Sequence, residues 1–267
     1  MPTTAKKTTA ATKKTTTATT KTTTATKKAA AKPKKAAVAV EKKAAKSTAN
    51  PAAAKKLVKS AAKADSRTTQ QRFGIVRLLA GHPAMRKLRD EGHIPSIHGN
   101  KHWPSADLLI DYLQEHPLKK KAHVLDAGCG WGLGGIYCAK TYKAKVTAVD
   151  ADDAVFPFLR AHAELNGVEI ECLKKKFQGV KKEVLKDIDA IIGADICFWD
   201  EMVKPLLKLI DRALDSGVKR VMIADPERSP FFTLAKKCAK RYGAELVEWR
   251  SEAYPRISGS ILVIDRR

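Results

Sequence analysis

Five glycines stand within eight residues, and the first of them lies two residues after an aspartate. The segment VLDAGCGWGLGG (124–135) runs a short apolar stretch into Asp126, after which Gly128, Gly130 and Gly132 alternate with other residues. Glycine tolerates left-handed backbone angles and lets a ligand lie close to the main chain. The pattern predicts a ligand-binding turn between a strand and a helix, for a dinucleotide, a nucleoside triphosphate or something smaller.

A second aspartate narrows the choice of ligand. Another apolar stretch ends in Asp150, eighteen residues beyond Gly132, where a carboxylate can accept hydrogen bonds from both hydroxyls of a ribose. Gly130, Gly132 and Gly135 also fit GxGxxG, which favours a dinucleotide. Asp126 argues against that ligand, because its carboxylate would lie beside a pyrophosphate. A triphosphate is disfavoured because no Gly-Lys-Ser/Thr follows the glycines.

Strand and helix patterns alternate around these residues. Short apolar strands are predicted at 123–127, 145–150, 168–173, 189–195 and 220–225. Helices are predicted at 104–116, 133–142, 152–165, 181–187 and 201–215. Such alternation implies an α/β fold, with a parallel sheet covered by helices on both faces. We expect this core at 122–267, preceded by a helical lead-in at 67–121 whose first helix lies around 68–91.

The end of the chain has a different pattern. A helix at about 230–242 is followed by the strand patterns AELVEWR (244–250) and SGSILVIDRR (258–267), with few residues between them. Two consecutive strands joined so closely should pair antiparallel.

Residues 1–66 have the composition of a disordered basic tail. They hold 17 lysines against two acids and no aromatic residue, so they carry +15 of the total net charge of +23. Such a segment cannot bury enough apolar surface to offset chain entropy. It resembles the lysine-rich tails of linker histones, and we expect either nucleic-acid binding through counterion release or a solvated tail without a dedicated partner. A transit segment is disfavoured because arginine is absent before Arg67.

The remaining composition indicates a soluble protein without a metal site. No apolar run approaches the length of a membrane span or a signal-peptide core. The five cysteines form no CxxC pair, which favours reduced thiols in a cytosol-like compartment. His98 and His102 have no third ligand in register, so we expect a substrate-side or structural role for them.

The element order resembles the class I methyltransferase fold. That fold is a Rossmann-like, seven-stranded, mostly parallel sheet ending in an antiparallel hairpin, and its enzymes use S-adenosyl-L-methionine. Its first strand ends in an acid followed by GxGxG, which Asp126 and the glycines at 128, 130 and 132 match. The resemblance implies that these residues bind the cofactor, with Asp126 meeting its amino-acid end and Asp150 its ribose.

Three further segments resemble the methyltransferase-16-like group, which includes protein-lysine methyltransferases and the electron-transfer-flavoprotein β-subunit lysine methyltransferases. HGNKHWPSADLLIDYL (98–113) resembles the segment before the first strand, where Trp103 matches a tryptophan beside the cofactor. DICF (195–198) fits the group's acid-x-x-aromatic motif, and ADPERSPF (224–231) is similar to its Asp-Pro-Gly-Arg segment. The resemblance covers about residues 70–267.

The sequence departs from the pattern in two places. Glu227 stands where related sequences often carry glycine, in a turn that can require a special backbone angle. Lys174, Lys175 and Lys176 follow the third strand, where many class I enzymes place an acid near the adenine. The sequence therefore does not identify an adenine-contacting carboxylate.

The resemblance implies a protein-lysine methyltransferase that works by direct displacement. Asp195 would adjoin the cofactor and orient the acceptor amine, while Phe198 and Trp199 would form an aromatic wall that tolerates a methylated cation. The structural alternative is that Asp195 caps the next helix and the two aromatic residues belong to the core.

Two other functions stay open: a methyltransferase for a small molecule or nucleic acid, and a non-catalytic protein that binds nucleic acid through residues 1–66. The Asn/Asp-Pro-Pro-Tyr motif of DNA amino-group methylation is absent at 195–198. We expect a protein substrate with a lysine acceptor, and a cytoplasmic location with nucleoid or nuclear association through the tail. The sequence leaves the oligomeric state open.

Overall fold

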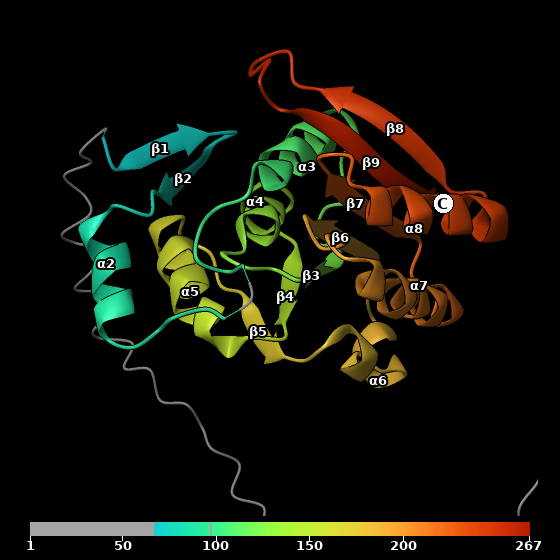
Figure 1. Cartoon of the computed structure of the whole chain (residues 1–267), viewed down its shortest axis with the longest axis horizontal. Helices are drawn as coiled ribbons and strands as arrows, with labels where there is room; N and C mark the ends of the chain where they lie inside the picture. Colours follow the sequence, from blue (N-terminus) through green and yellow to red (C-terminus); the bar gives the residue numbers. More distant parts are fainter. Residues whose placement is uncertain (1–66, 97) are drawn as a thin grey trace, which may run out of the picture. The chain divides into compact units, whose positions relative to one another are not determined.

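Seven strands form the main sheet of this computed structural model, which describes residues 67–96 and 98–267 (Figure 1). The strands lie in the order β5–β4–β3–β6–β7–β9–β8. The parallel strands are β3 (His123–Ala127), β4 (Lys145–Asp150), β5 (Glu171–Lys174), β6 (Ala190–Ala194) and β7 (Arg220–Asp225). β9 (Ser258–Asp265) pairs antiparallel with both β7 and β8 (Glu245–Arg250). The predicted Rossmann-like sheet and its terminal hairpin are confirmed, whereas the predicted tail at 1–66 lies outside the described residues.

Helices cover both faces of this sheet. Neighbouring residues Val124 and Leu125 of β3 are both fully buried, yet they belong to two separate apolar clusters, because successive side chains of a strand point to opposite faces. One cluster includes side chains of α3 (Pro104–Glu115), α4 (Leu133–Tyr142) and α5 (Phe156–Leu165). The other includes side chains of α6 (Lys182–Leu185), α7 (Asp200–Asp215) and α8 (Ser229–Tyr242). The apolar strands are therefore buried on both sides, as expected for a parallel sheet.

The predicted helix at 68–91 is wrong over its first half. Residues 69–78 form an antiparallel hairpin of β1 (Thr69–Arg72) and β2 (Ile75–Leu78), and only α2 (Pro83–Asp90) is helical. The two turn residues, Phe73 and Gly74, have φ angles of +52° and +74°. Such angles suit a two-residue hairpin, because their twist matches that of the flanking strands. The hairpin packs against the core face that holds α4 and α5.

The other predicted elements differ from the structure only at their ends. β5 is shorter than predicted at its start, since pairing with β4 begins at Glu171. The predicted helix at 152–165 begins with a 3-10 turn, η1 (Asp153–Val155), and a second turn, η2 (Phe177–Gly179), precedes α6. Within residues 67–96 and 98–267, no helix combines the length and the apolar character needed to cross a membrane.

Candidate active site

The carboxyl ends of the central strands surround a cavity of about 310 Å³. β3 is the first parallel strand in the chain, and its two neighbours, β4 and β6, continue the sheet in opposite directions. Ligands of open α/β sheets bind at such a switch point. A second cavity of about 50 Å³ adjoins the glycine turn, and a third of about 250 Å³ lies between the chain after β6 and the loop at 98–103.

Most of the predicted site residues meet here. The large cavity is lined by Trp103, Gly128, Gly130, Asp150, Asp195, Phe198 and Trp199. Asp126 and Gly132 line the 50 Å³ cavity instead, together with Trp103, Gly128 and Gly130. The nine predicted residues are therefore brought to one edge of the sheet, although their direct contact with a ligand stays a prediction.

The glycine turn is left-handed at each of its predicted positions. Gly128, Gly130 and Gly132 have φ angles of +65°, +50° and +71°. A Cβ atom at Gly128 or Gly132 would lie 2.6 Å from a buried side chain, Ile196 or Leu159 respectively. At Gly130 a Cβ atom would meet no atom within 4 Å. Two of the glycines thus allow close packing, and Gly130 leaves open space at the cavity.

Asp126 is buried beneath this turn. Its side chain accepts a hydrogen bond from the backbone N–H of Gly135, at 3.0 Å, in the first turn of α4. Burial raises the pKa of Asp126 to about 7, although that hydrogen bond opposes the shift. A positively charged group in the adjoining 50 Å³ cavity would favour the ionised carboxylate. This environment fits the ammonium group of an amino acid.

Asp150 is held at the end of β4 by backbone groups. Its Oδ2 accepts from Gly130 N at 3.1 Å and its Oδ1 from Asp152 N at 3.0 Å. Burial raises the pKa of Asp150. These hydrogen bonds fix the carboxylate at the wall of the large cavity, and each oxygen has further acceptor capacity for ribose hydroxyls.

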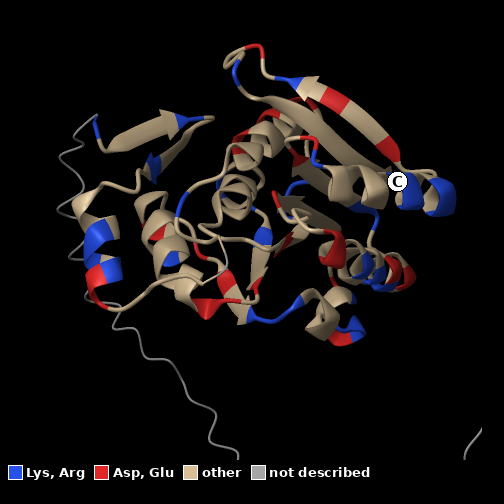
Figure 2. Ribbon diagram, in the orientation of Figure 1, with Lys and Arg blue, Asp and Glu red and all other residues tan. Residues whose placement is uncertain are grey.

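The segment after β5 brings amino groups, not an acid, to the same cavity. Lys175, Lys176, Phe177 and Gln178 line it, and lysines gather along the chain between β5 and α6 (Figure 2). The only acids that line the cavity are Asp150 and Asp195, among the residues the structure describes. The residue that would contact the adenine is therefore not identified by an acid after β5.

Asp195 is the first residue after β6 and has a left-handed φ of +58°. Its side chain is 5% exposed, and its Oδ1 forms an ion pair with Arg228 Nη1. Its Oδ2 is buried and has no hydrogen-bond partner among the described residues. A buried acceptor without a partner is costly, and other atoms of the same side chain line two of the cavities.

Arg228 joins two strand ends at this site. The same Nη1 lies 3.0 Å from Asp225 Oδ2, and the backbone N–H of Arg228 donates to Asp225 Oδ1 at 2.8 Å. Burial raises the pKa of Asp225 to about 6, against the opposing effect of Arg228. Arg228 was not among the predicted site residues. The signal for it was the segment ADPERSPF, whose likeness to Asp-Pro-Gly-Arg aligns Arg228 with the family's arginine.

Aromatic rings form much of the lining of the 250 Å³ cavity. The ring of His98 lies 5.1 Å from that of Phe198, 5.4 Å from that of Trp199 and 5.9 Å from that of Trp103, centroid to centroid. Trp199 is 47% exposed, so the idea that it belongs to the core is wrong. Asp195 and Arg228 line the cavity together with these four rings.

Glu227 confirms the special backbone angle suggested by the sequence. Its φ is +72°, in the left-handed region that favours glycine. Its Oε1 accepts a hydrogen bond from Ser260 Oγ at 2.9 Å, which ties the turn after β7 to β9.

Metal ligation is not supported in residues 67–96 and 98–267. No group of three or more His, Cys, Asp or Glu side chains is placed there to hold a metal ion. His98 faces the aromatic cavity, and His102 belongs to a cluster of charged residues at the start of α3. The five cysteines are free thiols.

The site residues fit S-adenosyl-L-methionine. The open space at Gly130, the buried Asp126 carboxylate and the fixed Asp150 carboxylate match a ligand with a ribose and an ammonium group. A cavity of about 310 Å³ is also within the range of small-molecule sites.

Solved structures with a similar fold superpose only in part. The Thermus thermophilus 16S rRNA N2 G1207 methyltransferase, in complex with AdoMet and guanosine, gives a TM-score of 0.49 at 17% identity over 75% of this chain and 45% of that one. TrmN from Thermus thermophilus gives 0.48 at 18% identity over 61% and 48%. Neither likeness is close enough to carry a conclusion about this chain.

Curated relatives match shorter regions. A ribosomal protein L11 methyltransferase of Aquifex aeolicus is 30% identical over 105 residues, which are 39% of this chain and 41% of that protein. The protein N-terminal and lysine N-methyltransferase EFM7 of Cryptococcus neoformans is 29% identical over 135 residues, 50% of this chain and 35% of that protein. The chain thus spans less than half the length of either relative.

The match to a family model covers most of the residues that line the cavities. It runs from α2 to α8 and includes the glycine turn, Asp150 and the segment after β6. Residues 87–237, more than half of the chain, match the family model described as lysine methyltransferase, and the chain therefore belongs to that family.

Proposed function

We propose that this chain transfers a methyl group from S-adenosyl-L-methionine to the side-chain amine of a protein lysine. The observation that carries the proposal is the buried Oδ2 of Asp195, which has no partner among the described residues and belongs to a side chain that lines the 250 Å³ cavity beside four aromatic rings. A lysine amine brings a hydrogen-bond donor, and its aliphatic stem and growing cationic character suit aromatic walls.

Residues of the large cavity would hold the cofactor. The glycine turn leaves room for it at Gly130, Asp150 would accept hydrogen bonds from its ribose, and Asp126 would offset the charge of its ammonium group. When bound, S-adenosyl-L-methionine supplies a methyl group on a sulfonium centre, which a nucleophile can displace without a covalent enzyme intermediate. The chain then has to position the reactants and exclude water.

The acceptor amine must be neutral to attack, because an ammonium ion has no lone pair. Asp195 would accept a hydrogen bond from this amine and so aim its lone pair. Arg228 fixes the other carboxylate oxygen, which keeps the side chain of Asp195 from rotating away. Phe198 and Trp199 would cover the reacting nitrogen and stabilise it once methyl transfer makes it cationic.

The names of the two relatives support a protein acceptor, since one is a methyltransferase of a ribosomal protein and the other of protein N-termini and lysines. An N-terminal α-amine is the second candidate acceptor, because it presents the same donor to Asp195 on a shorter stem. We also propose that residues 1–66, which lie outside the described residues, bind nucleic acid. This binding would associate a cytoplasmic enzyme with the nucleoid or the nucleus.

Transfer of label from methyl-tritiated S-adenosyl-L-methionine into lysate proteins tests the proposal. Hydrolysis of a labelled band followed by amino-acid analysis should yield methyl-lysine. Asp195→Asn should lower kcat at least tenfold, about 1.4 kcal/mol, with a smaller change in cofactor affinity. Asp200→Asn is the control, since that acid is exposed and lines none of the three cavities. Label confined to nucleic acid or small molecules, or equal activity of the two variants, would contradict the proposal.

A further inference from the structure

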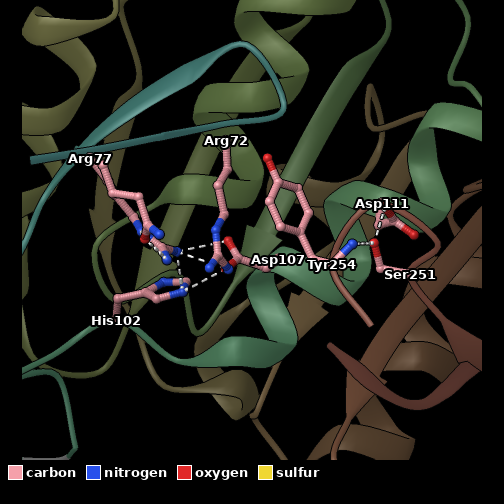
Figure 3. Close-up of polar contacts among 8 residues, drawn as sticks. Arg72, Arg77, His102, Asp107, Asp111, Ser251 and Tyr254 are labelled. Carbon is pink, nitrogen blue, oxygen red and sulfur yellow. Dashed lines mark hydrogen bonds and ion pairs between the residues drawn. The ribbon is translucent and has the colours of Figure 1, made fainter. Parts of the chain in front are cut away.

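A buried cluster of charged side chains joins the β1–β2 hairpin to the loop that lines the cofactor cavity (Figure 3). Its centre is Asp107 in α3, whose side chain is 4% exposed. Arg77 Nη1 donates to both carboxylate oxygens at 2.8 Å. Arg72 Nη1 donates to Oδ2 at 2.9 Å, and His102 Nε2 lies 3.3 Å from that oxygen. Burial alone would raise the pKa of Asp107, but its contacts with His102 and Arg77 outweigh that effect and lower it.

Arg77 is fixed from the hairpin side as well. Its Nε donates to Gln70 Oε1 on β1 at 3.0 Å. The backbone of β2 is held at the end of α5, where the next residue, Asn166, accepts from Val76 N at 2.8 Å and donates to Val76 O at 2.7 Å. The guanidinium position is therefore determined by two strands and a helix of the core.

The other end of this arrangement is the loop at 98–103. His102 Nε2 contacts Arg77 Nη1 as well as Asp107 Oδ2, and burial lowers the pKa of His102. At the start of the loop, Gly99 O accepts from Trp131 Nε1 at 2.9 Å. The loop is thus held at two points, and Trp103, next to His102, lines all three cavities of the site.

We propose that Arg77 is a positioning residue for cofactor binding and methyl transfer. It lines none of the three cavities, so it acts through Asp107 and through His102, which lines the 50 Å³ cavity and precedes Trp103. The hairpin is then part of the active-site scaffold and not a mere N-terminal extension. The role of Arg77 in methyl transfer rests on the proposed function. Its role in cofactor binding can be measured without any methyl acceptor.

Arg72 provides a matched control on the same hairpin. It pairs with the same carboxylate as Arg77, but its guanidinium lies over the ring of Tyr254, 4.6 Å from the centroid, and not against the loop. Loss of Arg72 removes one ion pair of Asp107 and leaves the contact between Arg77 and His102 in place. Figure 3 shows the two arginines approaching Asp107 with His102 on the side of Arg77.

The experiment measures the dissociation constant of S-adenosyl-L-methionine by calorimetry in the full chain, with folding checked by thermal unfolding. Arg77→Met should weaken binding at least tenfold, whereas Arg72→Met should change it less than twofold even if both variants melt at lower temperature. Equal cofactor affinity of folded Arg77→Met and the wild type would overturn the proposal, as would equal losses in the two arginine variants.

A second pair of variants decides the matter if Arg77→Met does not fold. Gln at position 102 can accept a hydrogen bond from Arg77 through its amide oxygen, and Ala cannot. His102→Gln should therefore bind the cofactor at least fivefold more tightly than His102→Ala, and equal binding by the two would refute the positioning role. A failure of the proposed function is distinguishable, because it would appear as absent lysine methylation while these differences in cofactor affinity persist.

Discussion

Replacement of Gly130 by alanine should have two effects, a loss of stability from backbone strain and a loss of cofactor affinity from the filled space. Gly130 has a φ of +50° and would place a Cβ atom in open space at the cavity. A left-handed angle costs a residue with a Cβ atom about 1 to 2 kcal/mol, and in a domain of this size 1 kcal/mol lowers Tm by roughly 2 to 4 °C. The added methyl group would also occupy space that we assign to the cofactor, so Gly130→Ala should weaken cofactor binding at least tenfold.

Gly167 offers the matched control. Its φ is +67°, a Cβ atom there would also meet nothing within 4 Å, and it lies after α5, away from the three cavities. Gly167→Ala should therefore lose the same stability as Gly130→Ala and keep the cofactor affinity of the wild type. Thermal unfolding and calorimetric titration with S-adenosyl-L-methionine measure the two quantities separately. If both alanine variants bind the cofactor equally well, the open space at Gly130 is not where the ligand lies.

Two further predictions concern stability. His162 is fully buried, its Nε2 accepts from Leu78 N at 3.1 Å, and burial lowers its pKa to about 4. The unfolded chain takes up the proton at a higher pH than the folded chain, so the free energy of unfolding falls as the pH drops below about 6.5. Between pH 7 and pH 5, urea unfolding should show a loss of this free energy about 2 kcal/mol larger in the wild type than in His162→Gln. An equal pH dependence in the two proteins would refute this prediction. Glu227→Ala should be less stable than Glu227→Gly by about 1 kcal/mol, since only glycine relieves the left-handed angle; equal denaturation midpoints would show that the angle costs nothing.

The central sheet was predictable because its signals are local. Each parallel strand is a short apolar run, and turns or helix ends separate the runs, so that β3, β4 and β7 were placed to the residue. The β1–β2 hairpin was not recognised. Its strand TQQR has no apolar residue, and what holds the hairpin is remote in the chain. Arg72 and Arg77 bind Asp107 of α3, and Val76 binds Asn166, the residue after α5. Contacts over such distances along the chain leave no periodic pattern in the sequence.

The same limit applies to the site. Asp126, Asp150 and the glycines occur at fixed spacings after strands, so the sequence indicated their place at one sheet edge. The pairing of Asp195 with Arg228 joins residues that follow different strands, β6 and β7. The sequence could suggest each residue by resemblance, but only the neighbouring strands in the fold bring their side chains together.

Backbone strain concentrates around the proposed acceptor cavity. Three residues with a side chain and a positive φ lie there: His98 and Asp195 line it, and Glu227 precedes Arg228, which also lines it. Each such angle costs on the order of 1 kcal/mol or more, so the surrounding contacts must compensate for it. At Asp195 the compensating contact is the ion pair with Arg228, and at Glu227 it is the hydrogen bond from Ser260. A residue bent in this way holds its side chain in one orientation, which is what a group that aims a reacting amine requires.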